Sequence, residues 1–414
     1  MAMLLETRLL FRKVKDLRSL TPRRGRVKEK WAATRAKHPP TSLALHHFDA
    51  KYSVQLGRLW PSVRVALLSE RKYGALLNNF SSDAVLANLQ AQGCRDFISD
   101  SDAEEYLYNL HPILSAAQSC PEPESEVGAD KQEESSDGAM KKSDVDDQQR
   151  PPFLLSRNIN CAVFPRGDIT RFKPARPDMQ GLLGYYLMDA ASVLPCLALD
   201  VQEGHRVLDL CAAPGGKSLA LLQTQAVRFL CVNDSSVSRT QRLRKVLRRY
   251  VPKEFLTDEN IRITSFDGTK WGEIERNTFD RVLVDVPCTT DRHSLTEDDN
   301  NIFSKSRTGE RRMLPKLQVE LLLAGIEAAC PGGEIMYSTC TLSQIQNMGV
   351  VEQAIHQAQQ NHGIHLEVVD LQLVTNMFRK TFHFAPDLHL GVMVVPHLAA
   401  NFGPIYMCKL KRMT

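Results

Sequence analysis

Residues 207–218 constrain the fold more than any other stretch of this chain. They read Val-Leu-Asp-Leu-Cys-Ala-Ala-Pro-Gly-Gly-Lys-Ser, so an apolar strand runs into a turn of small residues, and the apolar residues 219–222 then continue as a helix. In an open α/β sheet, ligands bind where a strand ends and the next helix begins. Gly215 and Gly216 lack a Cβ atom, so we expect backbone and ligand to approach closely there. The turn is therefore a predicted ligand site.

Two nucleotide-binding motifs can be compared with this turn. Residues 216–218 are similar to the end of a phosphate-binding P-loop, but Cys211 stands where that loop begins with glycine, and Pro214 removes one backbone amide. A G-x-G-x-x-G motif is also absent from the sequence. Asp234 ends the next apolar run about 25 residues after Asp209, near the ~20-residue spacing at which a carboxylate meets ribose hydroxyls. A ribose-bearing ligand without a phosphate cradle indicates S-adenosylmethionine, whereas an Asp that merely caps the following helix is the alternative.

Length and composition set the broad class. A chain of 414 residues exceeds the usual size of a single core, so we expect two domains or one domain with a long extension. No run of 18 apolar residues occurs, so no membrane span is expected. The ten cysteines include no C-x-x-C pair, which disfavours a zinc site and a disulfide framework. Free thiols in a reducing compartment are the expectation, with no bound metal.

Charge divides the chain into four predicted segments. The first forty residues hold twelve Lys and Arg against three acidic residues, and residues 1–26 are basic and amphipathic, as in a mitochondrial transit peptide. A basic arm that binds nucleic acid is the alternative interpretation. Residues 27–118 are predicted to be a helical region, with Leu76 and Leu77 on an apolar helix face. Residues 119–150 carry ten Asp and Glu and are predicted to be a disordered acidic linker, and residues 151–414 follow as the catalytic domain.

Strand and helix patterns alternate through that last segment, which predicts a doubly wound, Rossmann-like α/β sheet. The sheet is expected to be mostly parallel, with an antiparallel hairpin near the C-terminus and the helical region before it. Predicted strands cover residues 207–210, 229–234, 261–265, 281–285 and 334–338, the hairpin covers 391–395 and 405–410, and helices are predicted from residue 185 and over 313–329. A helix rich in arginine, from Arg239 to Arg249, has either a solvated or an RNA-facing surface.

Two cysteines directly follow consecutive predicted strands: Cys288 after the fourth and Cys340 after the fifth. The ends of neighbouring parallel strands lie side by side, so both thiols should reach the crevice beside residues 215–217. A single cysteine at such a place is usually a small buried apolar residue. Two of them beside a cofactor turn favour nucleophilic catalysis, in which a thiolate near a cation and helix N-termini is reactive.

Three motifs resemble a known family. Residues 209–217 (DLCAAPGGK), 285–288 (DVPC) and 337–340 (YSTC) are similar to the signature motifs of the Nol/Nop/Sun RNA cytosine-5 methyltransferases, and the resemblance covers roughly residue 150 to the C-terminus. Residues 53–60 and the stretch 400–404 resemble the mitochondrial branch of that family. One motif departs from the pattern, because the usual Pro-Cys-Ser-Gly-x-Gly reads Pro-Cys-Thr-Thr-Asp-Arg here and lacks two glycines.

The resemblance implies a covalent mechanism and a set of site residues. Cys340 would add to C6 of a cytosine, Cys288 would help to release the methylated product, and Asp285 would bind the N3 edge of the base and lie against the cofactor. The flipped or single-stranded base would enter a pocket beside the bound S-adenosylmethionine. The cofactor residues implied by the resemblance are Gly215, Gly216 and Lys217 at the methionine end, Asp234 at the ribose, and Arg239, Asp267 and Gly268 towards the adenosine.

The resemblance also implies a setting. It predicts an enzyme of the mitochondrial matrix that methylates ribosomal RNA, most simply of the small subunit, with a role in ribosome assembly. The implied partners are RNA and a mitochondrial transcription-termination-factor-like (mTERF) helical-repeat protein in a heterodimer. A non-catalytic assembly factor that binds RNA with such a partner is the second hypothesis, and a P-loop NTPase is disfavoured by Cys211 and Pro214.

Overall fold

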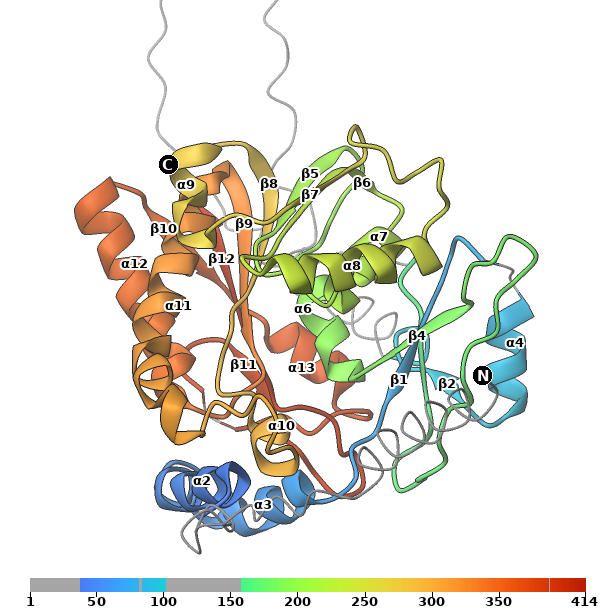
Figure 1. Cartoon of the computed structure of the whole chain (residues 1–414), viewed down its shortest axis with the longest axis horizontal. Coiled ribbons are helices and arrows are strands. Elements are labelled where there is room, and N and C mark those ends of the chain that lie inside the picture. The colour runs from blue at the N-terminus through green and yellow to red at the C-terminus, as the bar shows by residue number, and fades with distance from the viewer. Residues whose placement is uncertain (1–37, 82–83, 102–157, 387) are drawn as a thin grey trace, which may run out of the picture. The chain divides into compact units, whose positions relative to one another are not determined.

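The computed structural model describes residues 38–81, 84–101, 158–386 and 388–414. The predicted transit peptide and acidic linker lie outside these residues, as do the predicted boundaries of the segments. A compact unit runs from Pro40 to Thr414 and contains two β-sheets (Figure 1). No helix in the described part of the chain is long and apolar enough to cross a membrane.

The larger sheet is the predicted doubly wound sheet. Its strand order is β10-β12-β9-β8-β5-β6-β7, and β11 pairs with β12 alongside this path. Strands β9, β8, β5, β6 and β7 are parallel, whereas β12 is antiparallel to β9, β10 and β11. Its strands are β5 (His205–Asp209), β6 (Val227–Asn233), β7 (Ile261–Thr264), β8 (Phe279–Asp285), β9 (Ala329–Thr339), β10 (Leu366–Val369), β11 (Val392–Val394) and β12 (Ile405–Arg412).

The order of the parallel strands reverses between β5 and β8. From β5 the chain moves outward through β6 to β7, then returns to the other side of β5 to form β8 and β9. Ligands of such sheets bind beyond the strand ends at this switch point, because the loops from the two strands diverge there. The ends of β5 and β8 are Asp209 and Asp285, so the motifs found in the sequence meet at the switch point.

Helices cover both faces of this sheet (Figure 1). Successive strand residues point to opposite faces, so Val207 lies in one apolar cluster and Leu208 in the other. The first cluster includes Leu219 of α7 and Leu243 of α8, and the second includes Leu321 of α11. The helices are α6 (Leu194–Ala198), α7 (Gly216–Gln223), α8 (Val237–Tyr250), α9 (Trp271–Ile274), α10 (Asp291–Thr296), α11 (Thr308–Ala328), α12 (Met348–His362) and α13 (Gln372–Phe378).

The smaller sheet corrects the prediction of an all-helical N-terminal region. Leu76 and Leu77, expected on a helix face, lie in a strand instead. Residues 185–188, where a helix was expected to begin, also form a strand, and a short 3₁₀ helix follows it. Short apolar runs fit a buried strand and a helix equally well, so pairing with distant partners decides the outcome. The strands are β1 (Gly74–Leu77), β2 (Arg95–Asp96), β3 (Cys161–Val163) and β4 (Tyr185–Met188), all antiparallel in the order β2-β3-β1-β4, with α4 (Ala84–Ala91) between β1 and β2.

Two helices of the N-terminal region are present as predicted, α2 (Pro40–Leu56) and α3 (Trp60–Leu68). Asp49 of α2 joins them, because its carboxylate accepts from Trp60 Nε1 at 3.1 Å and from Arg64 Nε at 2.7 Å. The buried aromatic side chains of α2 and α3 belong to the same apolar cluster as α11 and β8. The N-terminal helices therefore pack onto the methyltransferase-like sheet rather than forming a separate core.

Candidate active site

The turn after β5 includes one residue with left-handed backbone, Gly215. Gly215 precedes α7 with φ = +113°, and a Cβ atom there would lie 2.7 Å from Leu243 Cδ1 of α8. A Cβ atom on Gly216 would lie 3.1 Å from the Tyr186 ring. The Leu243 and Tyr186 side chains therefore lie where Cβ atoms of these glycines would be, and the close approach of a ligand to their backbone stays a prediction. The missing side chains allow α7 and α8 to pack against the turn.

A cavity of 310 Å³ lies at the switch point. Five of the predicted cofactor residues line it, and they come from the loops after β6, β7 and β8 and from α8. Gly215, Gly216 and Lys217 do not line it. From the same turn, Ala213 and Pro214 line the cavity instead. The lining residues are Leu210, Cys211, Ala213, Pro214, Asn233, Asp234, Ser235, Arg239, Asp267, Gly268, Asp285, Val286, Pro287, Cys288, Thr290, Leu317, Leu321 and Cys340.

Asp234 supplies an acceptor to this cavity. Its side chain is 2% exposed, and its Oδ1 accepts the Ser236 amide at 3.0 Å. Its Oδ2 lies 3.2 Å from Arg239 Nη1, yet no aligned hydrogen bond reaches that oxygen. A buried carboxylate oxygen without a hydrogen bond carries a desolvation cost that a ribose hydroxyl would remove. The residues present therefore fit the ribose of S-adenosylmethionine.

Asn233 was not identified from the sequence, although it shapes the same cavity. Its side chain is fully buried and donates to the carbonyl oxygens of Leu210 at 3.2 Å and Phe266 at 3.1 Å, while its Oδ1 accepts the Phe266 amide at 2.9 Å. These bonds tie the end of β6 to the loops after β5 and β7. A polar residue closing an otherwise apolar run was the available signal. Arg239 adds a further tie, because its Nη2 donates to the Ala213 carbonyl at 2.5 Å.

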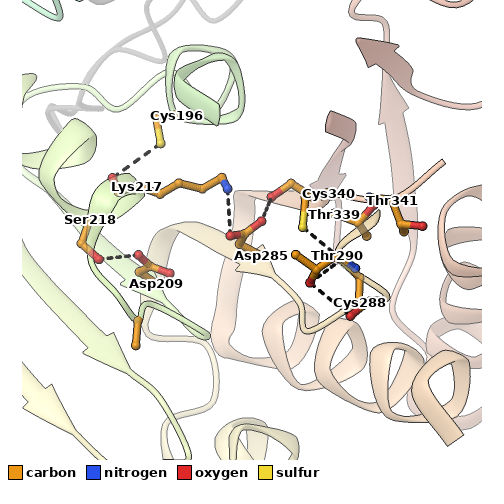
Figure 2. A network of polar contacts seen from close by, with 12 residues as sticks. Cys196, Asp209, Lys217, Ser218, Asp285, Cys288, Thr290, Thr339, Cys340 and Thr341 are labelled. Atoms are coloured by element: carbon orange, nitrogen blue, oxygen red, sulfur yellow. Dashed lines mark hydrogen bonds and ion pairs between the residues drawn. The ribbon is translucent and has the colours of Figure 1, made fainter. Parts of the chain in front are cut away.

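The Lys217 ammonium holds the carboxylate of Asp285 instead of facing the cavity. Lys217 Nζ donates to Asp285 Oδ2 at 2.8 Å, and Ser338 Oγ donates to Asp285 Oδ1 at 2.7 Å (Figure 2). Burial favours the neutral amine, but the adjacent Asp285 carboxylate outweighs it and raises the pKa of Lys217. The Asp285 carboxyl group is therefore fixed at the cavity wall by bonds from Lys217 and Ser338.

The two cysteines lie together, as the strand order predicted. Cys288 Sγ and Cys340 Sγ are 3.2 Å apart, and both line the cavity (Figure 2). A hydrogen bond from the Cys340 thiol lowers the pKa of Cys288, against the effect of burial, and the Thr290 amide at 3.3 Å lowers it further. The same bond and burial raise the pKa of Cys340. The hydrogen bond between the thiols therefore favours the ionised form of Cys288 and the protonated form of Cys340.

A second cavity, of 510 Å³, meets the first at the cysteine pair. Thr290 and Cys340 line both cavities. Its remaining walls come from the segment between α3 and β1, from α10, and from residues 403–405, and they include Arg71, Tyr73 and His293. A group that enters this cavity can reach Cys340 without passing Asp234, which lines the first cavity alone. Cys340 therefore has access to two different ligands.

Comparison with known proteins assigns the family. The profile described as 16S rRNA methyltransferase RsmB/F matches residues 196–411. The chain is 50% identical over 407 residues to the 5-cytosine rRNA methyltransferase NSUN4 of Xenopus tropicalis, covering 97% of this chain and 98% of the relative. It is 32% identical to a mitochondrial tRNA (cytosine(34)-C(5))-methyltransferase of Mus musculus, covering 89% and 90% of the two chains. The chain belongs to the Nol/Nop/Sun family of RNA cytosine-5 methyltransferases.

Solved structures agree on the fold. A methyltransferase homolog protein from Pyrococcus horikoshii superimposes with a TM-score of 0.55 at 19% identity, covering 90% of this chain and 97% of that chain. The Rossmann-like fold expected from the sequence is thereby confirmed, and the family profile and the NSUN4 relative confirm the expected enzyme class. S-adenosylmethionine is the cofactor of this Nol/Nop/Sun enzyme.

The family loop that lacks its two glycines keeps the backbone shape of a glycine. Thr290 stands at the first glycine position and adopts φ = +45°, which is a rare conformation for a β-branched residue. Arg292 stands at the second, where its buried guanidinium donates to the Gly403 carbonyl at 2.5 Å and to Asn401 Oδ1 at 2.5 Å. Side-chain contacts therefore hold this loop where the family motif has glycines. The sequence alone did not explain the replacement of these two glycines.

Proposed function

We propose that this Nol/Nop/Sun enzyme methylates C5 of a cytosine in ribosomal RNA through a covalent adduct between Cys340 and C6 of the base. The observation that carries the proposal is that Cys340 lines both cavities and lies 3.2 Å from Cys288, thiol to thiol. One cavity presents the free acceptor of Asp234, and the other opens to the surface beside Arg71 and His293. The names of the relatives support rRNA as the substrate class.

The chemistry requires an activated base, because C5 of cytosine is a weak nucleophile. S-adenosylmethionine supplies an electrophilic methyl group when bound beside the pair. Addition of the Cys340 sulfur to C6 moves the π electrons of the ring towards C5 and N3, splitting one difficult step into two easier ones. The Cys340 proton passes to the Cys288 thiolate across 3.2 Å and leaves through the cavity. N3 takes up one proton from solvent as the adduct forms, donates it in a hydrogen bond to the Asp285 carboxylate that Lys217 holds, and returns it when the product leaves.

Release of the product reverses the addition. A base must remove the proton from C5 so that the C5=C6 double bond forms again and the bond from C6 to Cys340 breaks. Cys288 is placed to take that proton, because the Thr290 amide at 3.3 Å still favours its thiolate while Cys340 is bonded to C6. The two cysteines therefore perform opposite steps on one base, and neither can replace the other.

The cofactor assignment makes a separate prediction for Asp234. Asp234→Ala removes the acceptor proposed for the ribose hydroxyls, so affinity for S-adenosylmethionine should fall by roughly 1–3 kcal/mol. Calorimetric titration of the purified protein measures this directly. Asp370→Ala is the matched control, because Asp370 Oδ1 accepts the Gln372 amide at 2.8 Å in the same kind of turn but does not line the cavity. An unchanged affinity in Asp234→Ala would remove Asp234 from the cofactor site.

We also propose a setting for the activity. The enzyme acts in the mitochondrial matrix on small-subunit rRNA during ribosome assembly, together with an mTERF-like helical-repeat protein. Support comes from the names of relatives, which include a mitochondrial enzyme, and from the basic N-terminal sequence. A partner is consistent with the mild net charge of +4, which gives limited attraction for the RNA backbone.

The test is methyl transfer to defined RNA. Purified protein and labelled S-adenosylmethionine should label mitochondrial small-subunit rRNA, and bisulfite mapping should place the methyl group at a single cytosine that is unmodified in cells lacking the protein. Labelling of tRNA alone would move the substrate to the class of the mouse relative. Defective ribosome assembly without loss of any 5-methylcytosine would favour the non-catalytic assembly factor instead.

A further inference from the structure

Asp291 is a buried carboxylate that the proposed reaction does not use. It lies three residues after Cys288, at the first position of α10, and is fully buried. Its Oδ1 accepts the Thr289 hydroxyl at 2.9 Å, and its Oδ2 accepts the Leu342 amide at 2.9 Å. One side chain therefore binds the loop of Cys288 and the loop of Cys340 together.

Tyr52 of α2 completes this bridge from a distant part of the sequence. Its hydroxyl donates to Asp291 Oδ2 at 2.9 Å and lies 3.2 Å from Thr341 Oγ1, the residue after Cys340. The ring is 2% exposed and is stacked on Phe48 at 4.9 Å, with Trp60 edge-on at 5.4 Å. Packing therefore fixes the phenol, and the phenol fixes both cysteine loops.

The next turn of α2 extends the same contact. Gln55 Nε2 donates to the Leu342 carbonyl at 2.5 Å, and Gln55 Oε1 accepts the Gln344 amide at 3.3 Å. Thr289 and Thr341 are further joined by a 2.8 Å bond between their hydroxyls. Neither Tyr52 nor Asp291 lines the cofactor cavity or the second cavity. Their influence on the reaction must therefore pass through the loops they hold.

We propose that Tyr52 is a positioning residue for the cysteine pair, acting through its bonds to Asp291 and Thr341. The proposal rests on the function assigned above to Cys288 and Cys340. The spacing of 3.2 Å between the two thiols depends on the relative position of their loops, and these loops belong to different strands, β8 and β9. Removing the phenolic oxygen takes one of the two donors from Asp291 Oδ2 and ends the contact with Thr341 Oγ1, so the bridge between the loops is weakened. The N-terminal helix α2 thus becomes part of the catalytic geometry.

The experiment compares Tyr52→Phe with the wild-type full-length protein. We expect kcat for methyl transfer to fall about tenfold or more, since small displacements of reacting groups have large effects on rate. The KM for S-adenosylmethionine should stay near the wild-type value. In the free protein, the apparent pKa of Cys288, read from the pH dependence of iodoacetamide alkylation by mass spectrometry, should rise because Cys340 no longer donates in line. Asp291→Asn, which keeps the side-chain volume, should shift both readouts in the same direction.

Tyr406→Phe is the matched control. Tyr406 is fully buried on β12 opposite Thr339, but its hydroxyl donates to the Leu390 carbonyl at 2.9 Å rather than to either cysteine loop. It should lower the melting temperature as Tyr52→Phe does but leave kcat and the Cys288 alkylation profile unchanged. An unchanged alkylation profile in Tyr52→Phe, or an equal effect of Tyr406→Phe, would overturn the proposal. Because alkylation requires neither RNA nor methyl transfer, this result is independent of whether the proposed function is correct.

Discussion

The turns after β5 and after β8 solve the same structural problem in different ways. Each leads from the end of a central strand into a helix, and each places a residue with left-handed backbone directly before that helix. After β5 the residue is Gly215, with φ = +113°. After β8 it is Thr290, with φ = +45°. The two turns meet at the switch point and enclose the same cavity.

The left-handed backbone has a different cause in each of the two turns. At Gly215 the glycine is required twice, by φ and by Leu243 at 2.7 Å from the missing Cβ. At Thr290 the strained conformation is held by contacts, because its amide donates to the Cys288 sulfur at 3.3 Å and the neighbouring Asp291 is bound from two sides. Strain of this kind persists where the surroundings over-determine the backbone. The first turn is a packing device, and the second directs an amide at a reactive thiol.

The largest effect is expected from Gly215→Ala. The added Cβ meets both an unfavourable φ and the Leu243 side chain, so the free energy of unfolding should fall by roughly 2–5 kcal/mol, and cofactor binding should be lost with it. Denaturant unfolding and calorimetry measure the two effects. Gly204→Ala is the control, because Gly204 has φ = +86° with open space around the missing Cβ. Equal losses in both variants would show that packing on α8 is not what requires glycine.

The same comparison extends to the last residue of each strand. Asp285 has Lys217 and Ser338 as partners, whereas Asp209 is fully buried with Ser218 Oγ at 2.6 Å and with Oδ1 unbonded. Burial raises the pKa of Asp209 to about 7. The unfolded chain therefore releases this proton near pH 4 while the folded protein keeps it until about pH 7, so the residue destabilises the fold progressively over that window.

The raised pKa of Asp209 gives a prediction for the stability of Asp209→Asn. The stability of the variant relative to wild type should rise by roughly 2–4 kcal/mol between pH 4 and pH 7 and stay constant above pH 7. Urea unfolding of both proteins across that range gives the difference between their free energies of unfolding. Taking this difference cancels the contributions of the other titrating groups, which both proteins share. Parallel stability curves would contradict the assignment of the raised pKa to Asp209.

The smallest effect is expected from Thr290→Gly. Relief of left-handed strain favours the variant by roughly 1–2 kcal/mol, and the larger freedom of the unfolded chain offsets about 0.5–1 kcal/mol of this. Stability should therefore change by less than about 1 kcal/mol, while the backbone amide that faces Cys288 is retained. Unfolding and Cys288 alkylation are the measurements. A clear loss of stability would mean that the Thr290 side chain, with its bond to the Cys288 carbonyl at 3.4 Å, contributes more than the strain costs.

Sequence reasoning predicted the elements whose signals are local. The five parallel strands, the glycine turn and the meeting of Cys288 with Cys340 follow from apolar runs and from the rule that neighbouring strand ends share a crevice. The strand at Leu76 was mistaken for a helix because its partners, β3 and β4, are about a hundred residues away. Pairing over that distance leaves no local pattern to read.

The residues of the site were likewise predictable only where their signal is local. Asp234 and Asp285 stand at strand ends, so their places could be foreseen. The role of Lys217 could not be foreseen. It depends on an ion pair of 2.8 Å between the Lys217 ammonium, in the helix after β5, and the Asp285 carboxylate, at the end of β8. Tyr52 and Asp291 carry no motif of their own, and their importance appears when the fold brings residues 239 positions apart within 2.9 Å.

The central claim is that Cys340 attacks the base and Cys288 releases it. Each single variant, Cys340→Ala and Cys288→Ala, is incubated with labelled target RNA and S-adenosylmethionine and run on a denaturing gel, with the double variant as control. The account predicts a protein–RNA adduct that survives denaturation in Cys288→Ala, and neither adduct nor methylation in Cys340→Ala. An adduct in Cys340→Ala and none in Cys288→Ala would contradict it and would make the thiolate of the free enzyme, Cys288, the attacking group.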